Sequence, residues 1–176
     1  AMNSVASARR PGDDHRDFRN ALGSFATGVT VVTTLDGDGR RYAMTVNSFA
    51  AVSLSPPLVL WSVSRESPSA RAFLSATNFA INVLAADQIA LSRHFARSSE
   101  DKFAGIEILA GVAGLPLIAG AAAVFQCRME AIHPGGDHAL HHGIVDQRRL
   151  VLGGGVVGHV VPFGSERRLG RGGTGP

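Results

Sequence analysis

The apolar pattern in the first third of the chain predicts one helix, a β-hairpin and a further strand. Phe18, Leu22 and Phe25 recur at helical spacing in DFRNALGSFA, where Asp17 can cap the helix and Gly28 can end it. The segments VTVVTTL and RYAMTV predict two strands, and the DGDG between them predicts a hairpin turn. The later segment LVLWSVS predicts a third strand, whose nearly continuous apolar run is typical of a strand covered on both faces.

The second part of the chain alternates short helices with strands and ends in two long strands. SPSARAFLSAT predicts a short helix with Ser67 as its cap and Pro68 at its first position, followed by the strand NFAINVL. AADQIALSRHFARS predicts a helix whose apolar face uses Ile89, Phe95 and either Leu91 or Ala96. Residues 101–120 are Gly-rich and predict a loop. AAAVFQCRMEAIH and HALHHGIVDQRRLVL then predict two long strands joined by a PGGD turn.

About six strands, with two or three helices between them and hairpins as the main connections, predict a mostly β fold. The expected architecture is an antiparallel sheet closed into a β-barrel with a few flanking helices. A doubly wound parallel sheet is the alternative. Residues 1–15 and 170–176 lack apolar periodicity and are expected to be mobile, which leaves one domain over residues 16–169.

Composition favours a soluble protein of one domain. The 176 residues are 45% hydrophobic but contain no apolar run of the length needed to cross a bilayer. The N-terminal segment does not resemble a signal peptide, and the single cysteine, Cys127, excludes an internal disulfide, so a cytoplasmic location is expected. The basic pI arises from the use of arginine, with Lys102 the only lysine, while the net charge is only +3. Without a basic stripe beside aromatic residues, nucleic-acid binding is not expected.

Small polar side chains are concentrated between the second and third predicted strands. Thr45, Asn47, Ser48 and Ser53 lie in a segment whose neighbours are apolar. A buried polar group without a partner costs about 1 to 3 kcal/mol, so these groups need hydrogen bonds. They can satisfy a tight bend in the backbone, or they can line a ligand site.

Motifs of conventional catalysis and of classical nucleotide binding are missing from the sequence. It contains neither GxGxxG after a strand nor GxxxxGK[ST], and GDGRR lies in the predicted hairpin turn. A phosphate would therefore be held by hydroxyls, amides and backbone N–H groups, with Arg65 as a possible added charge. Cys127, within a predicted strand, is more typical of packing than of a nucleophile. His138, His141 and His142 share one strand but cannot reach a single ion, so no metal site is expected.

Several segments together resemble the flavin reductase-like family. They are ATGVTVVTT, MTVNSFAAVSLSPPLVLWSV, NFAINVL, LSRHFA with DKFAG, GLPLIAGAAAVFQCRMEAIH and GGDHALHHGIV, which occur in order over residues 17–150. Members of that family are the reductase components of two-component flavin-dependent monooxygenases, and their fold is the FMN-binding split barrel. The NSF segment with its following PP, and the GDH turn, are the most specific parts of the resemblance.

The resemblance implies an NAD(P)H:flavin oxidoreductase. Such an enzyme reduces FAD or FMN with NADH or NADPH, acts as a homodimer and supplies reduced flavin to a partner monooxygenase. The flavin contacts it implies are Thr30, Thr45, Val46, Asn47, Ser48, Ser53, Ser62 and Phe103, and it places His138 near the nicotinamide. Two departures stand out: HALHHGIV has histidines at 141 and 142 where the family has apolar residues, and the C-terminal end lacks the family's Gly-Arg-aromatic segment.

Two other functions remain open at the level of sequence. One is a flavin-binding carrier or electron-transfer protein without NAD(P)H turnover. The other is an enzyme of the same fold that keeps its flavin and reduces another substrate.

Overall fold

The fold was obtained as a computed structural model, which describes Phe18, residues 22–150 and residues 158–159. The chain divides into two units, one of residues 28–159 and one formed by the two terminal segments. In the terminal unit, Phe18, Leu22 and Gly23 are helical, as the sequence predicts. Gly28 does not end this helix, because it lies in a short strand. Asp17, the two ends predicted to be mobile and the boundary at 169 lie outside the described residues.

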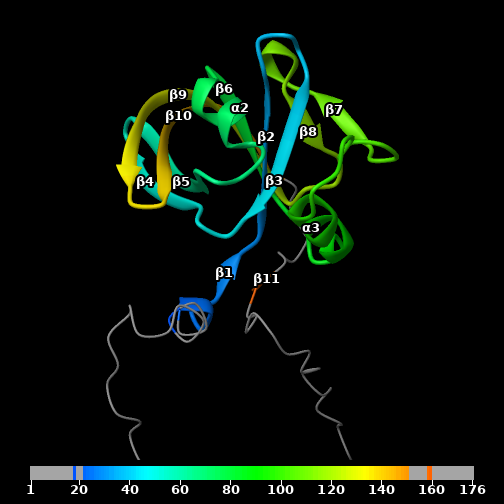
Figure 1. Ribbon diagram of the computed structural model, residues 1–176, viewed down its shortest axis with the longest axis horizontal. Helices are drawn as coiled ribbons and strands as arrows, with labels where there is room; N and C mark the ends of the chain where they lie inside the picture. The colour runs from blue at the N-terminus through cyan, green and yellow to red at the C-terminus, as the bar shows by residue number, and fades with distance from the viewer. Residues whose placement is uncertain (1–17, 19–21, 151–157, 160–176) are drawn as a thin grey trace, which may run out of the picture. The chain divides into compact units, whose positions relative to one another are not determined.

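Seven antiparallel strands form the main sheet (Figure 1). In spatial order they are β3 (Arg41–Val46), β2 (Thr30–Leu35), β6 (Asn78–Val83), β9 (Ala123–Gly135), β10 (His138–Leu150), β5 (Pro57–Ser64) and β4 (Ala50–Leu54). The prediction of a mostly β, antiparallel fold is confirmed, and the doubly wound alternative is wrong. Within the described residues no hydrogen-bonded pairing joins β3 to β4, so the sheet is open at these two edges.

Shorter strands complete the β structure and replace two segments that were predicted to be irregular. β4 forms a hairpin with β5, so the polar segment ends in a strand. The region predicted as a loop contains β7 (Ile108–Ala110) and β8 (Pro116–Ile118), which pair with each other around a 3-10 turn at Val112–Gly114. A further two-stranded ladder consists of β1 (Thr27–Gly28) and β11 (Gly158–His159).

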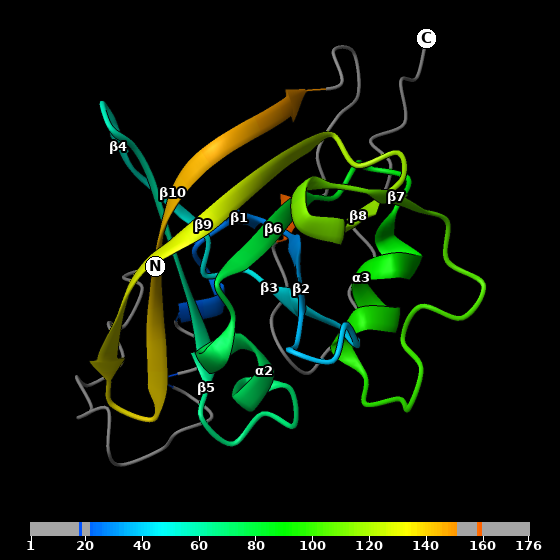
Figure 2. The ribbon, with the colours of Figure 1, turned by 90° about the horizontal axis from the view of Figure 1, so that it is seen from above.

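Among the described residues of the unit 28–159, two α-helices accompany the sheet. Helix α2 (Ala70–Ser75) begins after Ser69, so Ser67 and Pro68 precede it and the predicted cap is wrong. Helix α3 (Ile89–Ala96) lies beside β3, and Figure 2 shows it on the side of the sheet near β7 and β8. Phe95 is buried and Leu91 packs against the same cluster.

The other two candidates for the apolar face of α3, Ile89 and Ala96, are exposed. The apolar face of the helix is therefore narrow and consists of Phe95 and Leu91, not Ala96. The exposed positions of α3 are Ile89, Ala90, Arg93 and Ala96.

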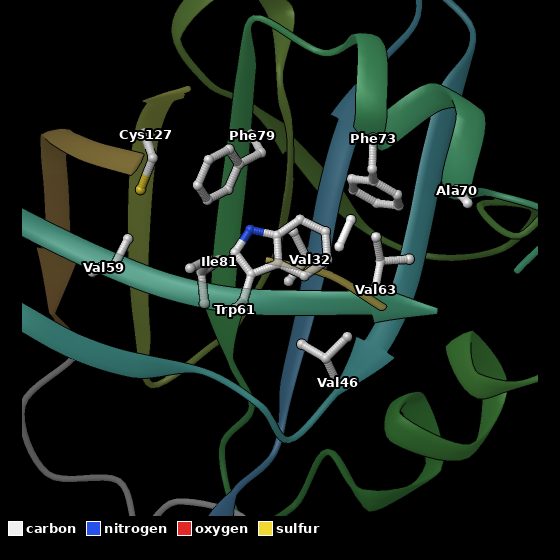
Figure 3. Close-up of a cluster of buried hydrophobic side chains, with 11 residues drawn as sticks. Val32, Val46, Val59, Trp61, Val63, Ala70, Phe73, Phe79, Ile81 and Cys127 are labelled. Atoms are coloured by element: carbon white, nitrogen blue, oxygen red, sulfur yellow. The ribbon is translucent and has the colours of Figure 1, made fainter. Parts of the chain in front are cut away.

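The main core lies on the concave side of the curled sheet and is centred on Trp61 of β5 (Figure 3). Phe73 of α2 meets the indole edge-on at a centroid distance of 5.1 Å, and Phe79 of β6 lies 5.8 Å away. Val59, Trp61 and Val63 are buried while the residues between them are half-exposed. Strand β5 is thus covered fully on one face only, which corrects the prediction of a strand covered on both.

Tight turns connect the strands of the β2–β3 and β9–β10 hairpins. In the β2–β3 turn, the Asp36 carboxylate accepts hydrogen bonds from the backbone N–H groups of Asp38 and Arg40. These bonds, chiefly the one from Arg40, hold the pKa of Asp36 below its usual value. In the β9–β10 turn Gly136 has a φ of 69°, a left-handed conformation that glycine adopts without strain. This second turn places His138 at the first position of β10.

Candidate functional site

The polar segment that follows β3 is held mainly by hydrogen bonds within the protein. The Ser48 hydroxyl accepts a hydrogen bond from the backbone N–H of Ser62 at 3.0 Å and lies 3.2 Å from the Ser62 carbonyl, to which it donates. The Ser53 hydroxyl accepts the N–H of Ser55 at 3.2 Å. Asn47 lies exposed in the bend between β3 and β4. The bend interpretation therefore accounts for the two serines and leaves the Asn47 amide facing solvent.

Two other predicted residues are buried beneath this segment. Thr30 is 1% exposed, and its hydroxyl donates to the Val46 carbonyl at 3.1 Å. The Val46 side chain belongs to the core around Trp61. Side-chain contact between either residue and a ligand would need the core to open, so any flavin contact here would come from the backbone. A direct role for Thr30 and Val46 stays a prediction.

A cavity of about 360 Å³ lies between β3, helix α3 and the loop that follows α3. Of the predicted site residues, Thr45 lines it. The Thr45 hydroxyl donates to the Ser92 carbonyl of α3 at 2.6 Å and so ties the helix to β3. The volume lies within the range of small-molecule sites, about 300 to 1,000 Å³.

On the other side of this cavity, Lys102 connects the loop after α3 to both β3 and α3. Its ammonium donates to the Ala43 carbonyl of β3 at 3.0 Å and to the Phe95 carbonyl of α3 at 3.1 Å. Its own carbonyl lies 2.7 Å from His94 Nε2. Burial of the ammonium lowers the pKa of Lys102 from its usual value. Phe103 is 8% exposed and packs on Phe95 beneath the loop, so it supports the cavity wall.

The remaining lining of the cavity is cationic and rich in hydroxyl groups. Arg40 precedes β3 and Arg41 is the first residue of this strand, and Glu100 is the single carboxylate of the lining. Hydroxyl groups are contributed by Tyr42, Thr45, Ser67, Ser69, Ser98 and Ser99. Such a lining suits an uncharged polar heterocycle with an attached phosphate, which is the chemistry of a flavin nucleotide or a nicotinamide nucleotide.

His138 lies at the end of the β9–β10 hairpin. Its Nδ1 is 2.8 Å from the Asp137 carboxylate, and its side chain is 41% exposed. Arg65, which follows β5, donates from Nε to the His138 carbonyl at 3.3 Å and from its backbone N–H to the Asp137 carbonyl at 3.0 Å. Since a carboxylate beside Nδ1 favours a proton on that nitrogen, Nε2 is left as the acceptor in the neutral ring.

The two unusual histidines have different surroundings. His141 is fully buried, stacks on Trp61 at a centroid distance of 4.5 Å, and places Nε2 3.2 Å from the Phe73 carbonyl. Its ring is sealed from solvent, and burial lowers its pKa. His142 points to the opposite face, where its ring lies 6.4 Å from that of His133. Among the described residues, no group of three or more metal-ligating side chains comes together.

Cys127 is 1% exposed. Burial, and to a lesser degree the nearby Asp146 carboxylate, raises the pKa of its thiol to about 12. A thiol of this kind is protonated at neutral pH and is not a nucleophile.

Sequence reasoning missed most of the cavity lining. Arg40 and Arg41 were assigned to a hairpin turn, and Lys102 was treated only as part of a composition argument. One signal was present, since the chain's only lysine lies in the DKFAG segment next to Phe103. The contact of this loop with β3 joins residues 59 positions apart, which local patterns do not reveal.

The profile of the flavin reductase like domain matches residues 22–155. The chain belongs to this family. This confirms the resemblance found in the sequence, and the match contains the whole cavity and the β9–β10 hairpin.

Among curated members of the flavin reductase-like family, the FMN reductase (NADH) SmoA of Agrobacterium fabrum is 47% identical over 153 residues, covering 84% of this chain and 87% of SmoA. The reductase subunit HsaB of a flavin-dependent monooxygenase from Rhodococcus jostii is 42% identical, covering 75% of this chain and 67% of HsaB. A solved structure, the NADH:FAD oxidoreductase SgcE6 of Streptomyces globisporus in complex with NAD and FAD fragments, superposes with a TM-score of 0.82 at 37% identity, covering 88% of this chain and 92% of SgcE6.

Proposed function

We propose that this protein is an NAD(P)H:flavin oxidoreductase that reduces FAD or FMN and supplies the reduced flavin to a partner monooxygenase. The observation that carries the proposal is the 47% identity to an NADH-dependent FMN reductase over most of both chains. The cavity beside β3 supports it, because its cationic, hydroxyl-rich lining fits a phosphorylated heterocycle. The similarity to SmoA and SgcE6 favours NADH as the reductant.

The residues of the chain would bind and orient, while the flavin ring supplies the hydride-accepting atom when it is bound. Asn47 is exposed and offers its amide to the ring or ribityl chain, and the Thr45 hydroxyl can still accept a hydrogen bond while it donates to Ser92. Ser48 and Ser62 hold the bend in shape. His138, oriented by Asp137, would hold the nicotinamide within reach of the flavin. No nucleophile is required for this reaction, in keeping with the inert Cys127.

The proposal includes a split barrel and a homodimer. The open edges β3 and β4 and the curled sheet are compatible with a barrel that is closed by side-chain packing. Val52 and Leu54 of the edge strand β4 are 53% and 93% exposed, which is unusual for apolar residues and favours a second copy against this edge. A cytoplasmic location also belongs to the proposal. In the described part of the chain, no helix is long and apolar enough to span a membrane.

A flavin-dependent NADH oxidation assay tests the function directly. Purified protein is incubated with NADH or NADPH and with FAD or FMN, and the absorbance at 340 nm is followed. Oxidation that depends on added flavin is expected, with NADH preferred. No flavin-dependent oxidation in any of the four combinations would contradict the proposal and would favour a flavin carrier. Flavin that stays bound through gel filtration after turnover would favour a reductase that retains its cofactor.

Two substitutions test the assigned roles. His138→Ala should lower turnover with NADH more than it lowers flavin affinity, because the side chain would orient the nicotinamide. Asn47→Ala should chiefly weaken flavin binding. If His138→Ala lowers turnover and flavin affinity equally, His138 does not act on the nicotinamide. If Asn47→Ala leaves flavin affinity unchanged, Asn47 is not a flavin contact.

A further inference from the structure

The Lys102 ammonium is a partly buried positive charge without a carboxylate partner in the described part of the chain. There, Arg128 forms an ion pair with Asp146, and the Asp137 carboxylate lies beside the His138 ring. Lys102 Nζ instead contacts two neutral carbonyls, those of Ala43 and Phe95. These acceptors use two of its three N–H donors and do not neutralise its charge. Since a partly buried ammonium gains from a nearby negative charge, this arrangement leaves Lys102 able to pair with an anion that enters the cavity.

The other residues that line the cavity indicate which kind of anion would bind Lys102. Three cationic side chains line the cavity against one carboxylate, Glu100. Arg40 and Arg41 bring planar guanidinium groups, which match the geometry of phosphate oxygens, and serines such as Ser69 and Ser98 add hydroxyl donors. A lysine ammonium beside arginines and hydroxyls is typical of phosphate sites rather than of sites for an uncharged ring.

We propose that Lys102 is a binding residue for a phosphate group of the nucleotide that enters this cavity. The two backbone carbonyls hold Nζ in place, and the third N–H is available for a phosphate oxygen. The inference rests on the proposed function, which supplies two sources of the same chemistry, the flavin phosphate and the pyrophosphate of the nicotinamide nucleotide. It adds Lys102 to the site and identifies phosphate as the group that this residue binds.

The test compares Lys102→Gln with the wild type on riboflavin, which has no phosphate, on the phosphate-bearing flavins FMN and FAD, and on NADH. Lys102→Gln should raise the KM for the phosphate-bearing ligand by about tenfold, the size expected for one charge-assisted hydrogen bond. The KM for riboflavin, which lacks phosphate, should change less than twofold. A rise for FMN and FAD assigns the site to the flavin, and a rise for NADH at fixed riboflavin assigns it to the nicotinamide nucleotide.

Controls separate phosphate binding from a general effect on the loop. Arg93→Gln removes an exposed cation of α3 that does not line the cavity and should leave every KM unchanged. Lys102→Arg keeps the charge and should retain most of the affinity. An equal loss for riboflavin and FMN would show that Lys102 only supports the fold, and would overturn the inference.

A direct binding measurement keeps the inference testable if Lys102→Gln does not fold. Inorganic pyrophosphate should bind the wild type by calorimetry and compete with the phosphate-bearing ligand in the assay. Absence of pyrophosphate binding in an enzyme that reduces flavin would overturn the Lys102 assignment and leave the function standing. Absence of any flavin-dependent NADH oxidation would instead reject the function, and pyrophosphate binding would still report on the cation site.

Discussion

The environment of His141 could not be assigned from the sequence and is defined by the structure. The sequence placed it where the family has apolar residues, and it could have faced solvent or a ligand. The cross-strand register sets His141 opposite Trp61, and both rings enter the core. Its Nε2 faces the Phe73 carbonyl, so the neutral ring carries its proton there and donates it.

Because burial lowers the pKa of His141 in the folded state, acid should destabilise the protein through this residue. Above the unfolded pKa, about 6.5, the ring is neutral in both states and carries no penalty. As the pH falls below 6.5, the unfolded chain binds a proton that the folded protein does not, and the free energy of unfolding falls by up to about 1.4 kcal/mol per pH unit. This loss continues until the pH reaches the lowered folded-state pKa.

His141→Phe should reduce this dependence of stability on pH. The substituted ring can still stack on Trp61, but the Phe73 carbonyl loses its donor, at a cost of about 1 to 3 kcal/mol at neutral pH. Urea unfolding of both proteins at pH 5, 6, 7 and 8 measures the effect. The difference in stability between them should shrink toward acid pH. A constant difference across this range would contradict a neutral, buried His141.

The attachment of α3 to β3 is the element-scale feature on which the cavity depends. Thr45→Val removes the hydroxyl that bonds the Ser92 carbonyl and should destabilise the protein by about 1 kcal/mol. It should also weaken flavin binding, because the helix forms one wall of the cavity. Thermal unfolding and flavin titration measure the two effects. Thr45→Ser keeps the hydroxyl and is the matched control. Full flavin affinity in Thr45→Val would show that the wall does not need this bond.

The Phe79 side chain of β6 lies against strand β10 at Gly143, next to a register shift between His142 and Gly143. A Cβ at this position would lie 2.5 Å from Phe79 Cζ and 3.2 Å from the Arg128 carbonyl oxygen. Gly143→Ala should therefore cost about 1 to 3 kcal/mol of stability, as overpacking does in well-packed cores.

Gly37→Ala is the control for this substitution, since a Cβ there meets no atom within 4 Å. The free energy of unfolding in urea distinguishes the two variants. Equal stability of Gly143→Ala and Gly37→Ala would mean that the Phe79 side chain packs against β10 less tightly than the structure shows.

Local sequence patterns predicted the elements that have strong periodicity and missed those that have little. The two hairpins, β6 and α3 were predicted because alternation, turn residues and helical spacing are clear in their sequences. Strand β4 was missed because Ala50, Val52 and Leu54 are all exposed together with Ala51, which leaves no buried face to create alternation. Strands β7 and β8 have only three residues each.

The site was harder to predict than the fold because local patterns in the sequence do not show contacts between distant residues. The flavin contacts implied by the family resemblance stay predictions, and several of their hydroxyls already form hydrogen bonds inside the protein, as Ser48 and Thr30 show. The cavity depends on contacts between β3 and a loop distant in sequence, in which Lys102 meets Ala43. No periodicity marks such a contact, so the cationic lining became visible only in the folded chain.

At the scale of the whole molecule, the exposed edge of β4 has a testable consequence for assembly. If a second copy covers Val52 and Leu54, the protein should sediment with about twice the 18.4 kDa of one chain. Leu54→Glu places a charge in that contact and should shift the equilibrium toward the monomer. Leu74→Glu, at an exposed apolar position of α2, is the control and should leave the mass unchanged. A wild-type protein that remains a monomer at high concentration would contradict the homodimer.

Trp61, the only tryptophan of the chain, also makes the core observable. Because the indole is fully buried and stacked against His141, its fluorescence should be blue-shifted in the folded protein and should move to longer wavelength on unfolding. Emission from one indole thus reports on β5, β10 and α2 together, without any added label. A disturbance of this core should therefore change the emission, which makes it measurable beside the effects of substitutions on ligand binding.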